Sequence, residues 1–155
     1  MPNLTRILLV DDSFRDAEMV INVFEACGLA HKVVHVRDGA DALDYLYRRN
    51  QFSERPEGNP SVVLLDIKMP RVDGLEVLRQ MKAEPLLQMI PVMLMTSSRE
   101  ERDLVEGYKL GANGYMVKSV NFQEFVEAVK RLGEFWAFVN EPPPGGKRYF
   151  EDTTN

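Results

Sequence analysis

Cysteine and histidine are scarce in this chain of 155 residues, which contains one cysteine, Cys27, and two histidines, His31 and His35. One cysteine cannot form an internal disulfide, and these three residues are too few for a Cys/His zinc cluster. Positive charge is also in the minority, because 19 lysines and arginines stand against 24 aspartates and glutamates, a net charge of −5. Since there is no dense Lys/Arg run, we expect the chain to bind neither nucleic acid nor an anionic membrane surface.

Long hydrophobic runs are absent as well. No segment approaches the roughly 18 consecutive apolar residues of a membrane span, and the apolar run near the N-terminus stops at Asp11, which is wrong for a secretion signal. The composition is nevertheless that of a folded protein, with 45% hydrophobic and 28% charged residues. We therefore expect a cytoplasmic protein with one domain over residues 1–140 and a Pro/Gly-rich tail over residues 141–155 that holds no effector domain.

Short apolar runs alternate with longer amphipathic stretches along the chain. In the amphipathic stretches, apolar residues recur three or four positions apart, the spacing of a helix with one buried face. The short runs are almost entirely apolar, as strands buried on both faces of a parallel sheet are; they cover residues 6–10, 32–36, 62–65, 91–95 and 114–117. Ser13, Asp73 and Asn121 precede helical stretches as N-cap residues do, and Gly28 and Gly111 follow two of them. The alternation predicts an α/β fold, a doubly wound five-stranded parallel sheet.

Residues capable of chemistry follow four of the five expected strands. Asp11 and Asp12 come after the first strand, Asp66 after the third, Thr96 after the fourth and Lys118 after the fifth. The carboxyl ends of parallel strands meet at one edge of the sheet, where α/β proteins bind their ligands. Three carboxylates repel one another there unless a cation joins them, and oxygen donors without His or Cys favour Mg²⁺. With Lys118 and Thr96 they form a cradle for a phosphoryl group, and Asp66 is the natural nucleophile.

These residues stand in motifs that resemble the receiver domain of two-component response regulators. The resemblance spans roughly residues 5–139 and is carried by VDDS at 10–13, LLDIKMPRVDG at 64–74, MTS at 95–97 and YMVK at 115–118. It implies the flavodoxin-like (βα)5 receiver fold. It also implies that Asp66 accepts a phosphoryl group from the phosphohistidine of a histidine kinase, and that the chain is no enzyme beyond slow autodephosphorylation.

The same resemblance assigns roles to other matching positions. The backbone carbonyl of Lys68 would ligate Mg²⁺ together with Asp12 and Asp66, and Asp11 would hold a metal-bound water. Lys118 would pair with the phosphoryl oxygens. Because Lys68 also adds a positive charge near the phosphoryl group, we expect it to influence the phosphoryl lifetime.

A switch is implied for two further positions. Thr96 would move toward the phosphoryl group and Tyr115 would follow it inward, which would remodel the face formed by the fourth helix, fifth strand and fifth helix. The family commonly has proline, after a cis peptide, where this chain has Ser119. A cis peptide before a non-proline residue costs about 2.5–4 kcal/mol, so the sequence leaves the Lys118–Ser119 peptide open between cis and trans.

The C-terminal segment narrows the choice of partner. Residues 132–143, with Lys118, Ser119 and the long polar crossover at 48–60, are similar to single-domain regulators paired with phytochrome-type histidine kinases. The similarity implies a light-regulated kinase as partner and is compatible with a homodimer.

Three neighbouring aromatic residues in this segment indicate a protein–protein interface. At 100° per residue, Phe135, Trp136 and Phe138 cannot all face the core. At least one should be exposed unless the tail, with Tyr149 and Phe150, folds over it. We expect an isologous dimer through the fifth helix.

Other functions remain open at this point. A metal-dependent phosphohydrolase with an aspartyl nucleophile usually has a second Asp two residues after the nucleophile, where this chain has Lys68. A flavodoxin-like nucleotide binder would need a Gly-rich loop after the first strand, where Asp11, Asp12 and Ser13 stand. A degenerate receiver that binds partners without phosphorylation is the third alternative.

Overall fold

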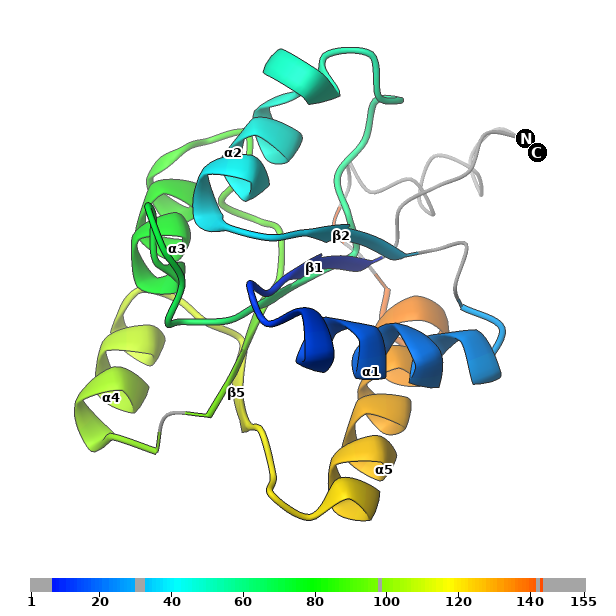
Figure 1. Cartoon of the computed structure of the whole chain (residues 1–155). Helices are drawn as coiled ribbons and strands as arrows, with labels where there is room; N and C mark the ends of the chain where they lie inside the picture. Colours follow the sequence, from blue (N-terminus) through cyan, green and yellow to red (C-terminus); the bar gives the residue numbers. More distant parts are fainter. Residues whose placement is uncertain (1–6, 30–32, 98, 142, 144–155) are drawn as a thin grey trace.

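Five parallel strands form one sheet in the order β2-β1-β3-β4-β5, so the predicted doubly wound α/β fold is confirmed. The structure is a computed structural model of the chain, and it describes residues 7–29, 33–97, 99–141 and 143 (Figure 1). The strands are β1 (Ile7–Val10), β2 (Val33–Val36), β3 (Val62–Leu65), β4 (Val92–Thr96) and β5 (Gly114–Val117). The first residues of the expected runs at 6–10 and 32–36 lie outside the described residues. β4 begins after Pro91, which has no N–H to donate to the ladder, and extends to Thr96.

The central strand β1 explains why the runs are so uniformly apolar. It pairs with β2 on one side and β3 on the other, so Ile7 lies opposite both Val33 and Val62. All four of its side chains are buried, and alternate ones point to opposite faces of the sheet. Because β1 and β3 are neighbours in register, the residues that follow them are brought together.

Helices cover both faces of the sheet (Figure 1). Side chains of α1 and α5 pack with Ile7 and Leu9 on one face, whereas α2 and α3 pack with Leu8 and Val10 on the other, beside α4. The bounds of the helices are α1 (Phe14–Ala26), α2 (Gly39–Tyr47), α3 (Gly74–Ala83), α4 (Glu101–Lys109) and α5 (Phe122–Glu134). A π-helical turn, η3 (Phe135–Val139), continues α5.

The predicted N-caps are confirmed. Ser13, Asp73 and Asn121 each accept a hydrogen bond from the backbone N–H three residues further on, at 3.2, 2.9 and 3.0 Å. Asp38 caps α2 in the same way at 2.8 Å, although its segment has the sequence of a plain turn. Gly28, with φ of +77°, ends α1 in the left-handed conformation that glycine adopts without strain.

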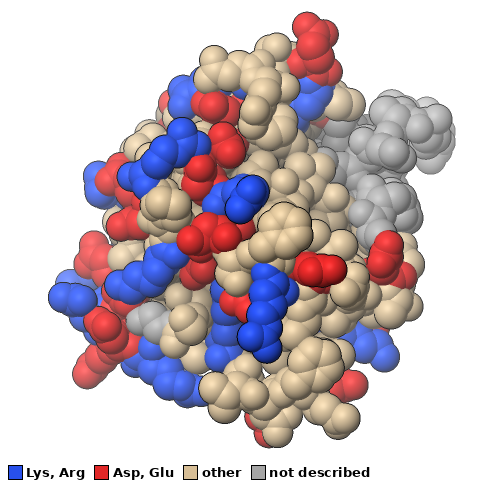
Figure 2. All heavy atoms as spheres, viewed as in Figure 1, with Lys and Arg blue, Asp and Glu red and all other residues tan. Residues whose placement is uncertain are grey.

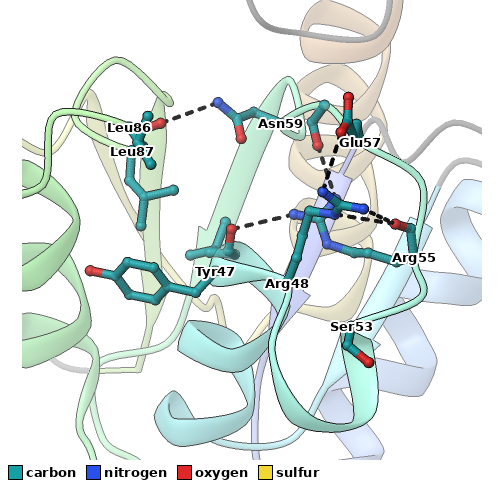
Figure 3. Close-up of a pocket in the computed structure, with 10 residues that line it drawn as sticks. Tyr47, Arg48, Ser53, Arg55, Glu57, Asn59, Leu86 and Leu87 are labelled. Atoms are coloured by element: carbon teal, nitrogen blue, oxygen red, sulfur yellow. Dashed lines mark hydrogen bonds and ion pairs between the residues drawn. The ribbon is translucent and has the colours of Figure 1, made fainter.

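Arg55 organises the polar crossover between α2 and β3. Its guanidinium donates to four backbone carbonyls, those of Tyr45, Leu46, Pro56 and Gly58. The crossover, which includes the 3₁₀ turn η2 (Asn50–Phe52), forms a hollow of about 690 Å³ with Leu86 and Leu87 (Figure 3). This hollow lies at the amino ends of β3 and β4, the end of the sheet away from the predicted site residues.

The remaining expectations concern the surface and the tail. Among the described residues no helix is long and apolar enough to cross a membrane. On the face drawn in Figure 2, Lys and Arg side chains are interspersed with Asp and Glu. Tyr149, Phe150 and most of the expected tail lie outside the described residues, so the boundary at residue 140 stays a prediction.

Candidate functional site

Three carboxylates meet where β1 and β3 end. One oxygen each of Asp11, Asp12 and Asp66 lies within 4.8 Å of the others. The backbone N–H of Asp66 donates to the carbonyl of Val10 at 2.9 Å, so the pairing of β1 with β3 continues into the site. Asp11 and Asp66 are buried and Asp12 is exposed. The sheet therefore brings together the acidic residues that the sequence predicts to share one site.

Burial sets the electrostatics of this cluster. Loss of water raises the pKa of Asp11, and the charge of Asp66 adds to this effect. The hydrogen bond and charge of Lys118 and the backbone N–H of Ser13 lower the pKa, but burial outweighs them. Among the described residues, the group of possible metal ligands here consists of carboxylates alone, and His35 Nε2 is hydrogen-bonded at 2.9 Å to the backbone carbonyl of Asp11. Such a carboxylate set fits a hard divalent cation such as Mg²⁺. Such an ion would offset the repulsion between the carboxylates.

Lys118 lies against this cluster. Its Nζ donates to Asp11 at 2.8 Å, to Asp16 at 2.9 Å and to Asp66 at 3.2 Å. The side chain is only 10% exposed. Burial alone would lower the pKa of Lys118, but the hydrogen bonds to Asp11 and Asp16 and the charges of Asp11 and Asp66 outweigh it and hold the pKa well above its usual value. The lysine is therefore a fixed cation within reach of Asp66.

Asp16 is a residue of this site that the sequence analysis missed. It lies in the first turn of α1, where an acidic residue has an ordinary explanation in the helix dipole. Its spacing of four residues from Asp12 would place it near the site once α1 is known to start at Phe14. The contact with Lys118 itself depends on the placement of β5 and could not be read from the sequence.

Thr96 and Tyr115 lie on the same face of the sheet. Thr96 is fully buried at the end of β4, and Leu94, two residues earlier, pairs with Tyr115. Tyr115 is half-buried and packs against the core on the side of α2, α3 and α4. The two residues thus lie on neighbouring strands and on the same face of the sheet, and their role as a switch stays a prediction.

The loop after Asp66 packs closely on its surroundings. A Cβ at Gly74 would collide with the backbone of Asp66, and the Gly74 N–H donates to Ile67 at 2.9 Å. Arg71, with φ of +64°, pairs with Asp38 at the start of α2, Nε to Oδ2 3.0 Å. The first turn of α3 can approach the Asp66 backbone only because residue 74 has no side chain.

Two loop positions, Lys68 and the Lys118–Ser119 peptide, lie beside the site. The side chain of Lys68 forms an ion pair with Asp103 of α4 at 3.6 Å. The proposed role of its backbone carbonyl as a metal ligand stays a prediction. The Lys118–Ser119 peptide, which the sequence left open, is trans.

The three aromatic residues after α5 differ in exposure, as their spacing in the sequence requires. Phe135 and Phe138 are 44% and 56% exposed, whereas Trp136 is half-buried against the core on the side of α1 and α5. The rings of Phe135 and Trp136 meet edge to face, with centroids 5.2 Å apart. The expected exposure of at least one aromatic residue is confirmed, and the dimer stays a prediction.

Most of the chain is similar in sequence to known proteins. A family model described as "Response regulator receiver domain" matches residues 7–130. The chain is similar to "Response regulator Rcp1" of Synechocystis sp., with 35% identity over 130 residues, which cover 84% of this chain and 87% of that protein.

Solved structures give the same result. The "Mn(2+)-bound form of response regulator Rcp1" matches with a TM-score of 0.82 and 34% identity, covering 88% of this chain and 97% of that one. The "Bacteriophytochrome response regulator RtBRR" matches with a TM-score of 0.72 and 51% identity, covering 97% of this chain and 90% of that one.

Proposed function

The chain belongs to the response regulator receiver domain family, and on that premise we propose that Asp66 accepts a phosphoryl group from a sensor histidine kinase. The observation that carries this proposal is the setting of Asp66. The residue is 7% exposed, shares a cluster with Asp11 and Asp12, and accepts a hydrogen bond from Lys118 at 3.2 Å. A buried carboxylate with a fixed cation beside it is suited to hold a transferred group of high negative charge.

The transfer exchanges one bond to phosphorus for another. A carboxylate oxygen of Asp66 attacks phosphorus while the bond to the histidine nitrogen of the kinase breaks, and that electron pair stays on the nitrogen. Asp66 becomes an acyl phosphate. Lys118 donates N–H to a phosphoryl oxygen, and the hydroxyl of Thr96 moves toward another. Donors held in place for the developing charge contribute most of the electrostatic stabilisation.

Mg²⁺ is the cation that we propose for this site. Asp12, Asp66 and the backbone carbonyl of Lys68 would ligate it, and Asp11 would hold a metal-bound water. When bound, it supplies positive charge that offsets the repulsion between the carboxylates and the phosphoryl oxygens. The donor set supports this, and the Mn²⁺-bound form of the relative Rcp1 supports a divalent cation.

Signalling then follows from a shift between two surface states. The receiver family consists of signalling proteins rather than conventional enzymes. We therefore propose that the acyl phosphate is lost only by slow autodephosphorylation. The proposed location of the protein is the cytoplasm. Thr96 and Tyr115 lie on the same face of the neighbouring strands β4 and β5, which supports transmission from the phosphoryl group to the face of α4, β5 and α5.

We propose a phytochrome-type histidine kinase as the partner. The support is the 51% identity to the bacteriophytochrome response regulator RtBRR, over 97% of this chain. A homodimer through α5 and the turn η3 that continues it is also proposed, because Phe135 and Phe138 of η3 expose large apolar side chains.

The test of the phosphoacceptor is intact-protein mass after incubation with acetyl phosphate and Mg²⁺. We expect one phosphoryl adduct on the wild type, its loss when Mg²⁺ is removed, and no adduct on Asp66→Asn. Asp44→Asn, which changes a carboxylate of α2 in the same way, should behave as the wild type. An equal adduct on Asp66→Asn, or none on the wild type, contradicts the proposal.

The partner is tested separately. A phytochrome-type histidine kinase labelled on its histidine should transfer the label to the wild type within seconds to minutes and not to Asp66→Asn. Transfer no faster than from an unrelated histidine kinase would leave the receiver chemistry standing and remove the phytochrome pairing.

A further inference from the structure

Lys118 has one more carboxylate partner than phosphoryl transfer requires. Its ammonium group has three N–H donors. Two are directed to Asp11 and Asp66, and the third to Oδ2 of Asp16 at 2.9 Å, which is shorter than the 3.2 Å to Asp66. No donor is left over, so the orientation of the ammonium group is fully determined.

A closed set of hydrogen bonds holds the Asp16 carboxylate in place. The backbone N–H of Ser13 donates to Oδ1 of Asp11 at 2.9 Å, and the backbone N–H of Asp16 donates to Oγ of Ser13 at 3.2 Å. Lys118 then joins Oδ2 of Asp16 to Oδ2 of Asp11 and completes the ring. The N-terminal turn of α1 is thus tied to the end of β5 through the side chain of Lys118.

From this arrangement, and resting on the phosphoacceptor role of Asp66, we propose that Asp16 is a positioning residue for phosphoryl transfer. With Asp11 it fixes two donors of Lys118 and thereby aims the third at the group on Asp66. When Asp66 becomes an acyl phosphate, the negative charge moves to the phosphoryl oxygens. Only the third N–H of Lys118 then has to turn toward the phosphoryl oxygens, because the other two stay hydrogen-bonded to Asp11 and Asp16.

The position of Asp16 separates this role from metal binding. Among the described residues, the carboxylates whose oxygens lie within 4.8 Å of one another are Asp11, Asp12 and Asp66, and Asp16 is not one of them. Its side chain is 31% exposed, whereas that of Lys118 is 10% exposed. Asp16 therefore acts on the lysine from the outer side of the site.

Two variants of Asp16 distinguish positioning of the Lys118 ammonium group through a hydrogen bond from an effect of the Asp16 charge alone. In Asp16→Asn the amide oxygen still accepts the hydrogen bond but the charge is gone, whereas Asp16→Ala removes both. Loss of a well-placed charged hydrogen bond typically costs about tenfold or more. We expect phosphorylation by acetyl phosphate to slow about tenfold in Asp16→Ala and to stay within about threefold of the wild type in Asp16→Asn. Glu18→Gln, an exposed residue of the same helix, should match the wild type.

A spectroscopic readout reports on the lysine directly. The ammonium protons of Lys118 should be protected from exchange with water in the metal-free wild type and in Asp16→Asn, and should exchange fast in Asp16→Ala when followed by ¹⁵N NMR. The Mg²⁺ dissociation constant should be the same for the two Asp16 variants, because each loses the same charge.

The outcomes separate this proposal from the one on which it rests. A wild-type rate in Asp16→Ala, or equal slowing in Asp16→Ala and Asp16→Asn, overturns the positioning role while the phosphoacceptor role survives. Slowing that only follows loss of folded protein, measured by urea unfolding of each variant, also overturns it. Failure of the wild type to become phosphorylated overturns both.

Discussion

Lys68, two residues beyond Asp66, forms an ion pair with Asp103 of α4, a residue that is 4% exposed, with 3.6 Å between Nζ and Oδ2. The lysine side chain is 59% exposed. The segment that follows the proposed phosphoacceptor is thus joined to the helix that borders the proposed signalling face. A phosphoryl group on Asp66 would compete with Asp103 for this lysine.

The competition predicts a shorter phosphoryl lifetime in Lys68→Ala. The lysine of this pair is exposed, and an ion pair at the surface contributes up to about 1 kcal/mol, so we expect dephosphorylation to be about two- to fivefold faster. The rate is measured by intact mass after removal of acetyl phosphate. Lys109→Ala, which removes an exposed lysine at the end of the same α4, is the control and should decay as the wild type. An unchanged rate in Lys68→Ala would falsify the prediction.

Gly74→Ala should damage both stability and phosphorylation. The added Cβ collides with the backbone of Asp66, which cannot move without disturbing the site. We expect a loss of about 1–3 kcal/mol in urea unfolding and slower modification by acetyl phosphate. Gly28→Ala serves as the comparison, because no atom beyond its two chain neighbours lies within 4 Å of its added Cβ. It should cost about 1–2 kcal/mol through its left-handed backbone and leave the phosphorylation rate unchanged.

Asp38 should make stability depend on pH. Partial burial raises its pKa, but the backbone N–H of Asp41 and the Arg71 guanidinium outweigh this, so the pKa lies below its usual value. The native state therefore keeps Asp38 ionised while the unfolded chain protonates near pH 3.9. The stabilisation is complete above that pH and is lost as the pH falls through the lower native value.

The variant that tests this is Asp38→Asn, since asparagine keeps the N-cap and removes the charge. Its free energy of unfolding should fall less than that of the wild type between pH 6 and pH 3, by at most about 1 kcal/mol. Arg71→Gln should show only part of this flattening, because the Asp41 N–H still lowers the pKa of Asp38, and adding Arg71→Gln to Asp38→Asn should flatten the curve no further. Parallel pH curves for wild type and Asp38→Asn would show that the pair contributes nothing to folding.

Metal binding should reverse the order of stability between wild type and Asp12→Asn. Without metal, removing one of three clustered charges should stabilise the protein by up to about 1 kcal/mol. With Mg²⁺ at a hundred times its dissociation constant the wild type should gain about 2.7 kcal/mol, and the variant much less. Thermal unfolding with EDTA and with Mg²⁺ measures both. Equal Mg²⁺ stabilisation of the two proteins would mean that Asp12 is not a ligand.

The dimer is predicted to depend on Phe138. Its side chain is 56% exposed, and replacement by serine removes apolar surface without opening a cavity in the core. We expect Phe138→Ser to weaken self-association at least tenfold in sedimentation equilibrium. Leu86→Ser, at a residue 76% exposed in the loop before β4, should not. A wild type that stays monomeric at tens of micromolar, phosphorylated or not, contradicts the proposed dimer.

The sequence predicts the fold and the centre of the site for one physical reason. Residues directly after parallel strands share an edge of the sheet, so Asp11, Asp66 and Lys118 could be placed together before any contact was known. Side chains that reach across from helices and loops have no such rule. Asp16 and Asp103 lie in the first turns of α1 and α4, where the helix dipole already explains an acidic residue. The contact of Asp103 with Lys68 depends on the conformation of a loop, and that of Asp16 with Lys118 depends on the placement of β5.

The same limit applies to the crossover at residues 48–60. Its polar composition predicts a loop, and a loop is observed. That Arg55 alone would satisfy four carbonyls there depends on one side-chain conformation in a segment without periodicity.

The π-helical turn after α5 changes the direction in which the end of the chain presents its side chains. The N–H of Asn140 donates to the carbonyl of Phe135, five residues back, at 2.7 Å, so this turn holds one residue more than an α-helical turn. Removing one residue between Phe135 and Val139 would restore the α-helical phase and rotate everything beyond it by about 100°. A single-residue gap at this turn in an alignment of related chains therefore marks a different outward face of the helix, rather than a shorter version of the same one.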